Sequence, residues 1–242
     1  ITPDDILIVI DEIQECPTAI TSLKYFCENA PEYAVAAAGS LLGLSAHEGT
    51  GYPVGKVNTL DLFPLSFREF LDATGNIMFR KLLDSRDTCS MKSFAPKITT
   101  FLRQYYVVGG MPAAVNAFVQ GAEFSEVRKI QSDILEGYQR DFAKHAPYRM
   151  LPRMMEAWES IPSHLSQENR KFIFGHIRKG ARAKDYEEAL TWLIQAGLII
   201  RVPRVSKPGF PLASYNDHKS FKVFLLDVGL LGAMSELEPT AI

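Results

Sequence analysis

The clearest pattern along the chain is a short aliphatic run that ends in two acids. Residues 6–10 read ILIVI, and Asp11 and Glu12 follow directly. An apolar run of this length without polar alternation is typical of a strand that is buried on both faces of a parallel sheet. Two further apolar runs, YAVAAAGS over residues 33–40 and KVNTLDLFPL over residues 56–65, also predict strands.

Helix signals separate these predicted strands. Pro17 is typical of the first turn of a helix, and the apolar spacing continues this helix to about Asn29. Ser66 followed by Glu69 forms the capping-box pattern, which predicts a second helix from Phe67 to about Ala73. The alternation of strands and helices predicts an α/β layer over residues 1–75.

The middle of the chain, residues 76–165, shows helical spacing without strand signals. Gly109-Gly110 and Pro112 predict a break between two helices, since glycine and proline interrupt helices. Residues 125–145 carry apolar side chains at helical spacing, and another helix is expected over about 151–164. We therefore expect no continuous strand between residues 80 and 160.

The last part, residues 166–242, returns to mixed signals. A helical pattern ends at Gly197 and is followed by an Ile- and Val-rich strand, a turn-rich segment and a second strand, FKVFLLD. Helices followed by a two-stranded hairpin are the layout of a winged helix-turn-helix. The sequence thus predicts three parts, with bounds 1–75, 76–165 and 166–242.

Composition excludes several classes of protein. The net charge of −2 is nearly neutral, so any surface for a polyanion must be local. The three cysteines lack metal-ligand or disulfide spacing, and the five histidines lack an i, i+4 pair, so neither a disulfide framework nor a zinc site is expected. Because the chain also shows neither an apolar run long enough for a bilayer nor a leader pattern, we expect a cytoplasmic protein.

The acidic pair at the end of the first strand has the residue types of a Walker B motif. In that motif the first acid supports Mg²⁺ and the second orients or deprotonates the attacking water. Ligands in open α/β sheets lie beyond the carboxyl ends of strands, which is where Asp11 and Glu12 are expected. The alternative is that both acids are simply solvated at the start of a loop.

A nucleotide site also needs groups that sense and cradle phosphates. Ser40, at the end of the second predicted strand, suits a γ-phosphate sensor, although a turn or helix-capping serine is an equally good interpretation. The one Gly-Lys pair, Gly55-Lys56, has the wrong spacing for a phosphate-binding loop, and Val57 stands where Ser or Thr is required. We therefore expect the phosphate loop to precede Ile1.

Several phrases of the chain resemble one bacterial and archaeal family. These are ILIVIDEIQECP, AAAGSLLGL, GKVNTLDLFPLSFREFL, YYVVGGMPAAV, DILEGYQRDF and, near the end, FKVFLLDVGLL. They follow in the order seen in AAA-type (P-loop) ATPases that carry a C-terminal domain of unknown function, the domain of unknown function 4143.

The resemblance implies a fold and an activity. The fold would be an α/β remnant of a P-loop AAA-type core, followed by an all-α region and a winged-helix-like α+β domain. Glu12 would be catalytic, Asp11 would hold Mg²⁺ through the nucleotide, and Ser40 would sense the nucleotide. The chain would be truncated at both ends. Its parent would use ATP and Mg²⁺, whereas this chain alone would be inactive and would bind ATP weakly or not at all.

A local excess of positive charge lies in the predicted winged-helix region. On such a layout it is typical of DNA contact, although winged helices also serve as protein-docking modules. A homo-oligomer or an unknown protein partner is equally compatible with the sequence, and no membrane contact is expected. The candidate nucleic-acid contacts are Arg178, Lys179, Arg182, Lys184, Arg201 and Arg204.

Three hypotheses follow for the function. The first is an AAA-fold ATPase fragment whose parent couples hydrolysis to conformational change or partner remodelling. The second is a winged-helix nucleic-acid-binding module without nucleotide turnover, and the third is a protein-docking protein. Two smaller candidates are a hinge at Gly109-Gly110 and a phosphate-sensing Arg140 next to Asp141, each with an ordinary alternative: a helix-breaking turn and a solvated helix end.

Overall fold

The computed structural model describes residues 2–39, 53 and 55–238. The chain is a mixed α/β protein that divides into two compact units. The first comprises Ile1–Leu62 with Thr191–Leu198, and the second comprises Phe63–Leu190 with Ile199–Ile242. The three-part division expected from the sequence stays a prediction.

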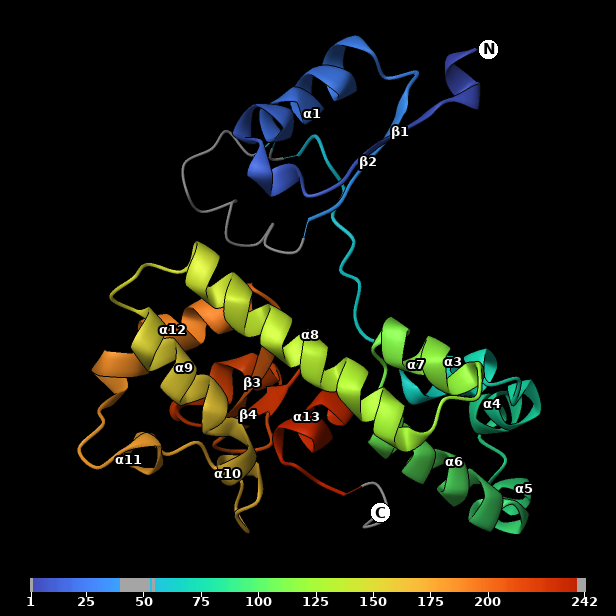
Figure 1. The fold of residues 1–242 in the computed structure, drawn as a ribbon, viewed down its shortest axis with the longest axis vertical. Coiled ribbons are helices and arrows are strands. Elements are labelled where there is room, and N and C mark those ends of the chain that lie inside the picture. Colours follow the sequence, from blue (N-terminus) through green and yellow to red (C-terminus); the bar gives the residue numbers. More distant parts are fainter. Residues whose placement is uncertain (1, 40–52, 54, 239–242) are drawn as a thin grey trace. The chain divides into compact units, whose positions relative to one another are not determined.

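The first unit contains a two-stranded parallel sheet. Strand β1 (Leu7–Ile10) pairs with β2 (Ala34–Ala37), and the two are joined through helix α1 (Pro17–Asn29) (Figure 1). Short 3-10 turns, η1 (Pro3–Asp5) and η2 (Ile13–Glu15), flank β1. The predictions for residues 6–10, 17–29 and 33–40 are thus confirmed as a strand, a helix and a strand where the structure describes them.

Two predictions for the first unit are wrong. Leu7 and Val9 are 62% and 63% exposed, so within the described residues one face of β1 is bare rather than buried. Residues 56–65 form no strand. Leu60 and Leu62, 85% and 91% exposed, lie in this extended segment. The apolar alternation was present, but a strand also needs a partner that accepts its backbone hydrogen bonds, and no described strand does so.

The second unit begins with a helical part. Helix α3 (Phe67–Ala73) starts at the predicted capping box, in which Ser66 and Glu69 bond to each other's backbone N–H. The order continues through α4 (Ile77–Ser85), α5 (Thr88–Ser93), α6 (Ala95–Val108), α7 (Pro112–Val119) and α8 (Phe124–His145). The predicted break at Gly109-Gly110 and the absence of strands from 80 to 160 are confirmed.

Two apolar cores hold these helices together. One contains Phe70, Val108, Ala114, Val115 and Val127 from α3, α6, α7 and α8. The other lies where α8 meets α9 (Leu151–Glu159), and there Trp158 is fully buried with its ring 5.4 Å from that of Phe142. The helix expected over 151–164 is divided at Ser160, since α10 (Ile161–Leu165) follows as a separate helix.

The C-terminal elements are α11 (Phe174–Ile177), α12 (Ala183–Gln195), β3 (Ile199–Val205), η3 (Leu212–Tyr215), β4 (Asn216–Leu225) and α13 (Val228–Met234). Strands β3 and β4 pair antiparallel, with an irregularity between Pro203 and Arg204. The predicted hairpin is confirmed, whereas its assignment as a winged helix stays a prediction. Helix α13 returns to pack against α6 and α8 (Figure 1).

Candidate functional site

The acidic pair lies at the carboxyl end of the parallel sheet. Ile10 is paired with Ala37, so the chain leaves both strands at the same edge. Asp11 and Glu12 follow β1 there, and both side chains are exposed. The position matches the expectation, because ligands of open α/β sheets are bound beyond this edge.

The segment after β1 is fixed to the segment after β2 by two backbone hydrogen bonds. Ala38 donates its N–H to the carbonyl of Ile10 at 2.8 Å, and Ile13 donates its N–H to the carbonyl of Ala38 at 3.0 Å. The two acids therefore lie in a short loop whose ends are both attached to the neighbouring strand.

Glu12 has a constrained backbone and side chain. Its φ of 49° and ψ of 43° are in the left-handed region, which is sparsely populated by residues other than glycine and costs on the order of 1–3 kcal/mol. Asp11 Oδ1 accepts the N–H of Glu12 at 3.0 Å, and Gln14 Nε2 donates to Glu12 Oε2. Such strain persists where the surrounding structure enforces it, and it clusters at functional sites.

Gln14 adds an unsatisfied polar atom next to the acids. Its Oε1 is buried without a hydrogen-bond partner, and among the described residues it is the one buried side-chain atom in this condition. Buried polar atoms are normally paired, and unpaired ones often mark a position that water or another group fills. The Oε1 atom of Gln14, close in sequence to Glu12, can therefore accept a hydrogen bond that no described residue donates.

The donor set fits a magnesium ion that is bound mainly by a nucleotide. No group of three His, Cys, Asp or Glu side chains in the described part of the chain is arranged to hold a metal. Mg²⁺ in nucleotide sites takes only one or two protein carboxylates and keeps its other ligands from phosphates and water. Asp11, with an exposed carboxylate, meets that requirement, and an all-protein metal cage is not expected.

The structure describes one of the two other residues considered for a nucleotide site. Ser40 lies outside the described residues. Lys56 forms an ion pair with Glu28, with 3.2 Å between Nζ and Oε1, so it is engaged in the first unit. This agrees with rejecting Gly55-Lys56 as a phosphate-binding loop.

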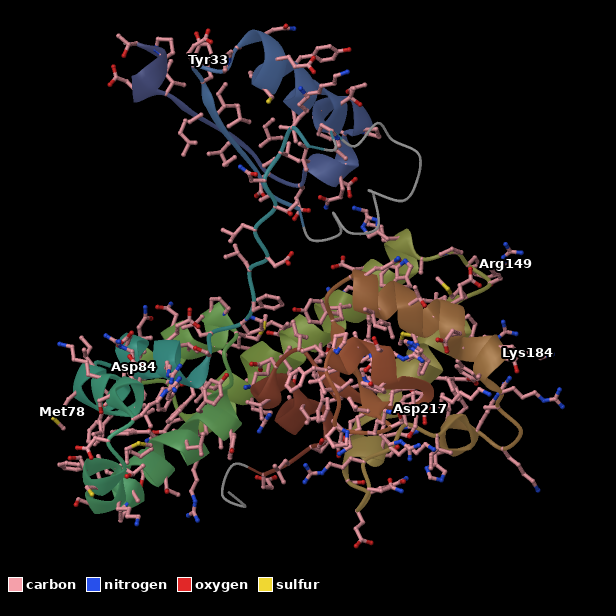
Figure 2. All side chains as sticks on the ribbon, turned by 180° about the vertical axis from the view of Figure 1, so that it is seen from behind. Tyr33, Met78, Asp84, Arg149, Lys184 and Asp217 are labelled. Carbon is pink, nitrogen blue, oxygen red and sulfur yellow. The ribbon has the colours of Figure 1, made fainter. Side chains whose placement is uncertain are left out.

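In the C-terminal part, Arg201 and Arg204 of the six candidate nucleic-acid contacts form ion pairs within the protein. Arg201 forms an ion pair with Glu187, and its Nη2 donates to the carbonyl of His218 at 3.0 Å. Its Cζ atom lies 3.8 Å from the centre of the Phe221 ring. Arg204 is bonded to Asp217 at 2.8 Å, and Asp217 is labelled in Figure 2.

The remaining candidates lie at or before the start of α12. Arg178 is 3.6 Å from Glu156. Lys179, Arg182 and Lys184 are exposed, and Lys184 is labelled at the start of the helix in Figure 2. DNA contact by these residues stays a prediction.

The two smaller candidates are explained by ordinary contacts. Arg140 pairs with Glu136 one helical turn away at 3.3 Å, on an exposed surface where such pairs contribute little. Gly110 is held on both sides, because its N–H donates to Asp227 Oδ2 at 2.6 Å and its carbonyl accepts the N–H of Leu65 at 2.7 Å. These two bonds favour a locked corner between α6 and α7 rather than a hinge.

This buried corner is also a site of polar interactions that no sequence pattern predicted. Asp227 is 4% exposed and also accepts the N–H of Leu230 through Oδ1 at 2.9 Å. Gln131 is fully buried, and its Nε2 donates to the carbonyls of Val107 and Val108 at 2.9 Å each. Together they satisfy backbone groups that the end of α6 leaves without helical partners.

Arg128 completes the corner. Its Nη1 donates to Gln131 Oε1 at 2.8 Å and to the carbonyl of Gly229 at 3.1 Å. The segments YYVVGGMP and DVGLL belong to the stretches that resemble the family, and Gln131 lies just before a third, DILEGYQRDF. The sequence thus contains these segments as recognisable stretches, but it does not show that their residues contact one another in the fold.

Burial changes the acidity of the groups at this corner. Desolvation raises the pKa of Asp227, although the N–H groups of Gly110 and Leu230 act in the opposite direction. Tyr105, whose hydroxyl donates to the carbonyl of Leu65 at 2.8 Å, has its pKa raised to about 12 by burial and by the nearby charges of Asp227 and Glu69. Both pKa shifts favour the neutral forms, which are the protonated carboxyl of Asp227 and the phenol of Tyr105.

Comparison with known proteins assigns both ends of the chain to family models. Residues 1–71 match the model of an AAA domain. Residues 99–241 match the model described as domain of unknown function (DUF8612). Neither a curated protein nor a solved structure matches the chain. None of the described helices has the length and apolarity that crossing a membrane requires.

Proposed function

Since the chain belongs to the family described as domain of unknown function (DUF8612) and its first 71 residues match an AAA domain, we propose that it is part of a Mg²⁺-dependent ATPase. ATP and Mg²⁺ would be bound at the carboxyl edge of the β1–β2 sheet. Hydrolysis would drive a conformational or partner-remodelling task carried out through the second unit.

The geometry of Glu12 is the observation that carries the proposal. A solvated acid at the end of a strand needs neither a left-handed backbone nor a bond from Gln14. Both features restrict the position of the Glu12 carboxylate, and a residue that directs one oxygen at a water molecule benefits from a fixed position. The AAA match over the same residues supports this interpretation.

The two acids have different tasks in the proposed site. Mg²⁺, when bound with the nucleotide, neutralises charge on the phosphates. Asp11 would support this ion through its exposed carboxylate. Glu12 would accept a hydrogen bond from the attacking water, orient it and hold its proton. Gln14 would position Glu12 by donating to Oε2.

The layout of the second unit supports a further assignment. We infer that residues 166–242 are a winged-helix-like domain, because α11 and α12 precede the β3–β4 hairpin along the chain. The resemblance to proteins with the domain of unknown function 4143 is part of the same inference, whereas the model that matches here is that of DUF8612.

The test uses the full product of the gene that encodes these residues. ATP hydrolysis is measured at steady state with and without Mg²⁺, and nucleotide binding is measured by calorimetric titration. We expect Glu12→Gln to keep nucleotide binding and to lower turnover by about 10²–10⁴-fold, since only the water-orienting group is lost. Asp11→Ala should weaken Mg²⁺-dependent binding as well as turnover.

Glu32→Gln serves as the matched control, because Glu32 is an exposed acid in the same unit, in the loop before β2. It should leave binding and turnover unchanged. An unchanged ATPase rate in Glu12→Gln, or no hydrolysis by the unmodified protein, would overturn the proposal. The first outcome would mean that the acids only end a strand.

A further inference from the structure

The loop of the β3–β4 hairpin displays a large apolar side chain to solvent. Phe210 is 92% exposed, and Leu212, two residues later, is 49% exposed. An exposed phenyl ring lacks the stabilisation that burial of its apolar surface would give. A single exposed aromatic needs no explanation by itself, so the loop around it must be considered.

Specific contacts hold this loop in one conformation. Ser206 donates both its N–H and its hydroxyl to the carbonyl of Tyr215, at 2.9 and 3.1 Å. Gly209 lies directly on the Tyr215 ring, since a Cβ at this position would be 2.5 Å from Cε2. The Nζ atom of Lys207 is 4.7 Å from the centre of the same ring. Tyr215 therefore organises the loop that presents Phe210.

The hairpin carries a local positive charge. Residues 199–225 contain five Lys or Arg and one Asp, which gives a formal charge of +4 against −2 for the whole chain. Arg201 and Arg204 are already paired with Glu187 and Asp217. The lysines at 207, 219 and 222 are exposed, and none of them forms an ion pair within the described residues.

The adjacent helix α12 is less suited to a polyanion. Asp185 lies in its first turn, and Glu187 and Glu188 follow. Glu187 also neutralises Arg201, so the corner between α12 and β3 has little free positive charge. Besides the exposed Lys179, Arg182 and Lys184 near the start of α12, charge without an ion pair in the described part of the chain lies on the hairpin, whose loop also carries Phe210.

We propose that this hairpin loop binds single-stranded nucleic acid. Phe210 would stack on an unpaired base, and Lys207 and Lys219 would contact flanking phosphates. Aromatic side chains next to uncommitted positive charge are the combination that single-strand binders use, because every base has a π-face and every nucleotide a phosphate. A duplex offers phosphates but keeps its bases stacked on each other.

The experiment measures fluorescence anisotropy of a labelled oligo-dT of about 20 nucleotides mixed with the full chain. Phe210→Ala should weaken binding by about tenfold, the effect expected for one lost base–aromatic stack. The matched control is Tyr148→Ala, which removes an aromatic ring that is 91% exposed elsewhere in the same unit. This control should bind like the unmodified protein.

The charge contribution is read from salt dependence between about 50 and 200 mM. Lys207→Ala with Lys219→Ala should lower the slope of log K against log salt by about 0.7 per lysine. Lys129→Ala, an exposed lysine on α8, should leave the slope unchanged. Circular dichroism of each variant confirms that the fold is retained.

Three results would overturn the proposal. The first is equal binding by Phe210→Ala and Tyr148→Ala. The second is binding of a duplex of the same length at least as tightly as oligo-dT. The third is Phe210-dependent binding to vesicles of anionic and zwitterionic lipid without binding to oligo-dT, which would assign the loop to a membrane surface instead.

Discussion

The carboxylate of Asp227 accepts the backbone N–H of Gly110 at 2.6 Å, across 117 residues of sequence. The same side chain accepts the N–H of Leu230 at 2.9 Å and thereby caps α13. One buried acid thus fixes the start of α13 and the corner between α6 and α7. Loss of the Asp227 carboxylate would leave both buried N–H donors unpaired, which is more costly than the net value of the bonds.

We expect Asp227→Ala to lower the free energy of unfolding by about 2 kcal/mol or more, since each unpaired buried N–H costs about 1–3 kcal/mol. Asp227→Asn keeps one acceptor and should cost less. Urea unfolding followed by circular dichroism measures both. The control is Asp133→Ala, an exposed position on α8, which should change stability by no more than about 0.5 kcal/mol. Equal effects at 227 and 133 would contradict the role of the corner.

A pair of glycine substitutions tests how tightly the corner is packed. A Cβ at Gly110 would lie 2.0 Å from the carbonyl oxygen of Leu65, so Gly110→Ala requires the backbone to move. We expect it to destabilise the protein at the upper end of about 1–3 kcal/mol. Gly137→Ala on α8 meets nothing within 4 Å and should stabilise it by up to about 1 kcal/mol. The midpoint temperature of thermal unfolding should fall in Gly110→Ala and rise in Gly137→Ala.

Tyr105 gives the corner a pH dependence in the alkaline range. Its pKa is raised from the ordinary value near 10 to about 12, so its contribution to stability is complete below pH 10 and is lost as the pH rises through about 12. Burial also raises the pKa of Tyr138 and of Tyr186. Absorbance titration of phenolate should therefore show a late component near pH 12 that decreases in Tyr105→Phe.

The same substitution also removes the hydrogen bond to Leu65, which should cost about 1 kcal/mol at neutral pH. Tyr148→Phe, at a 91% exposed position, should leave stability at neutral pH unchanged. If the absorbance change near pH 12 were the same in Tyr105→Phe as in the unmodified protein, its assignment to Tyr105 would be wrong.

Local signals were enough to predict much of the fold. Pro17 marked the start of α1, and the Ser66–Glu69 capping box marked the start of α3. Gly109-Gly110 and Pro112 marked the break between α6 and α7. Each of these signals acts within a few residues, so the sequence carries it without knowledge of the tertiary structure.

Features that depend on distant partners were not predicted. Residues 56–65 have the alternation of a strand, but forming one requires a neighbouring strand, which local sequence does not specify. Arg201 and Arg204 were expected to contact nucleic acid. Their acid partners, Glu187 and Asp217, lie 14 and 13 residues away, and the structure was needed to pair them. For the acids at 11 and 12, the sequence predicted the position at the strand end but not the constrained backbone of Glu12.

The long separation between Gly110 and Asp227 has a consequence for how the protein is made. At about 5–20 residues per second, a ribosome needs on the order of ten seconds to pass from one to the other. Gln131 leaves the ribosome early enough to occupy the carbonyls at the end of α6 while the rest is still being translated. The N–H of Gly110 must instead wait until the hairpin has been synthesised, so the helical part is completed only after residues more than 100 positions further along the chain have emerged.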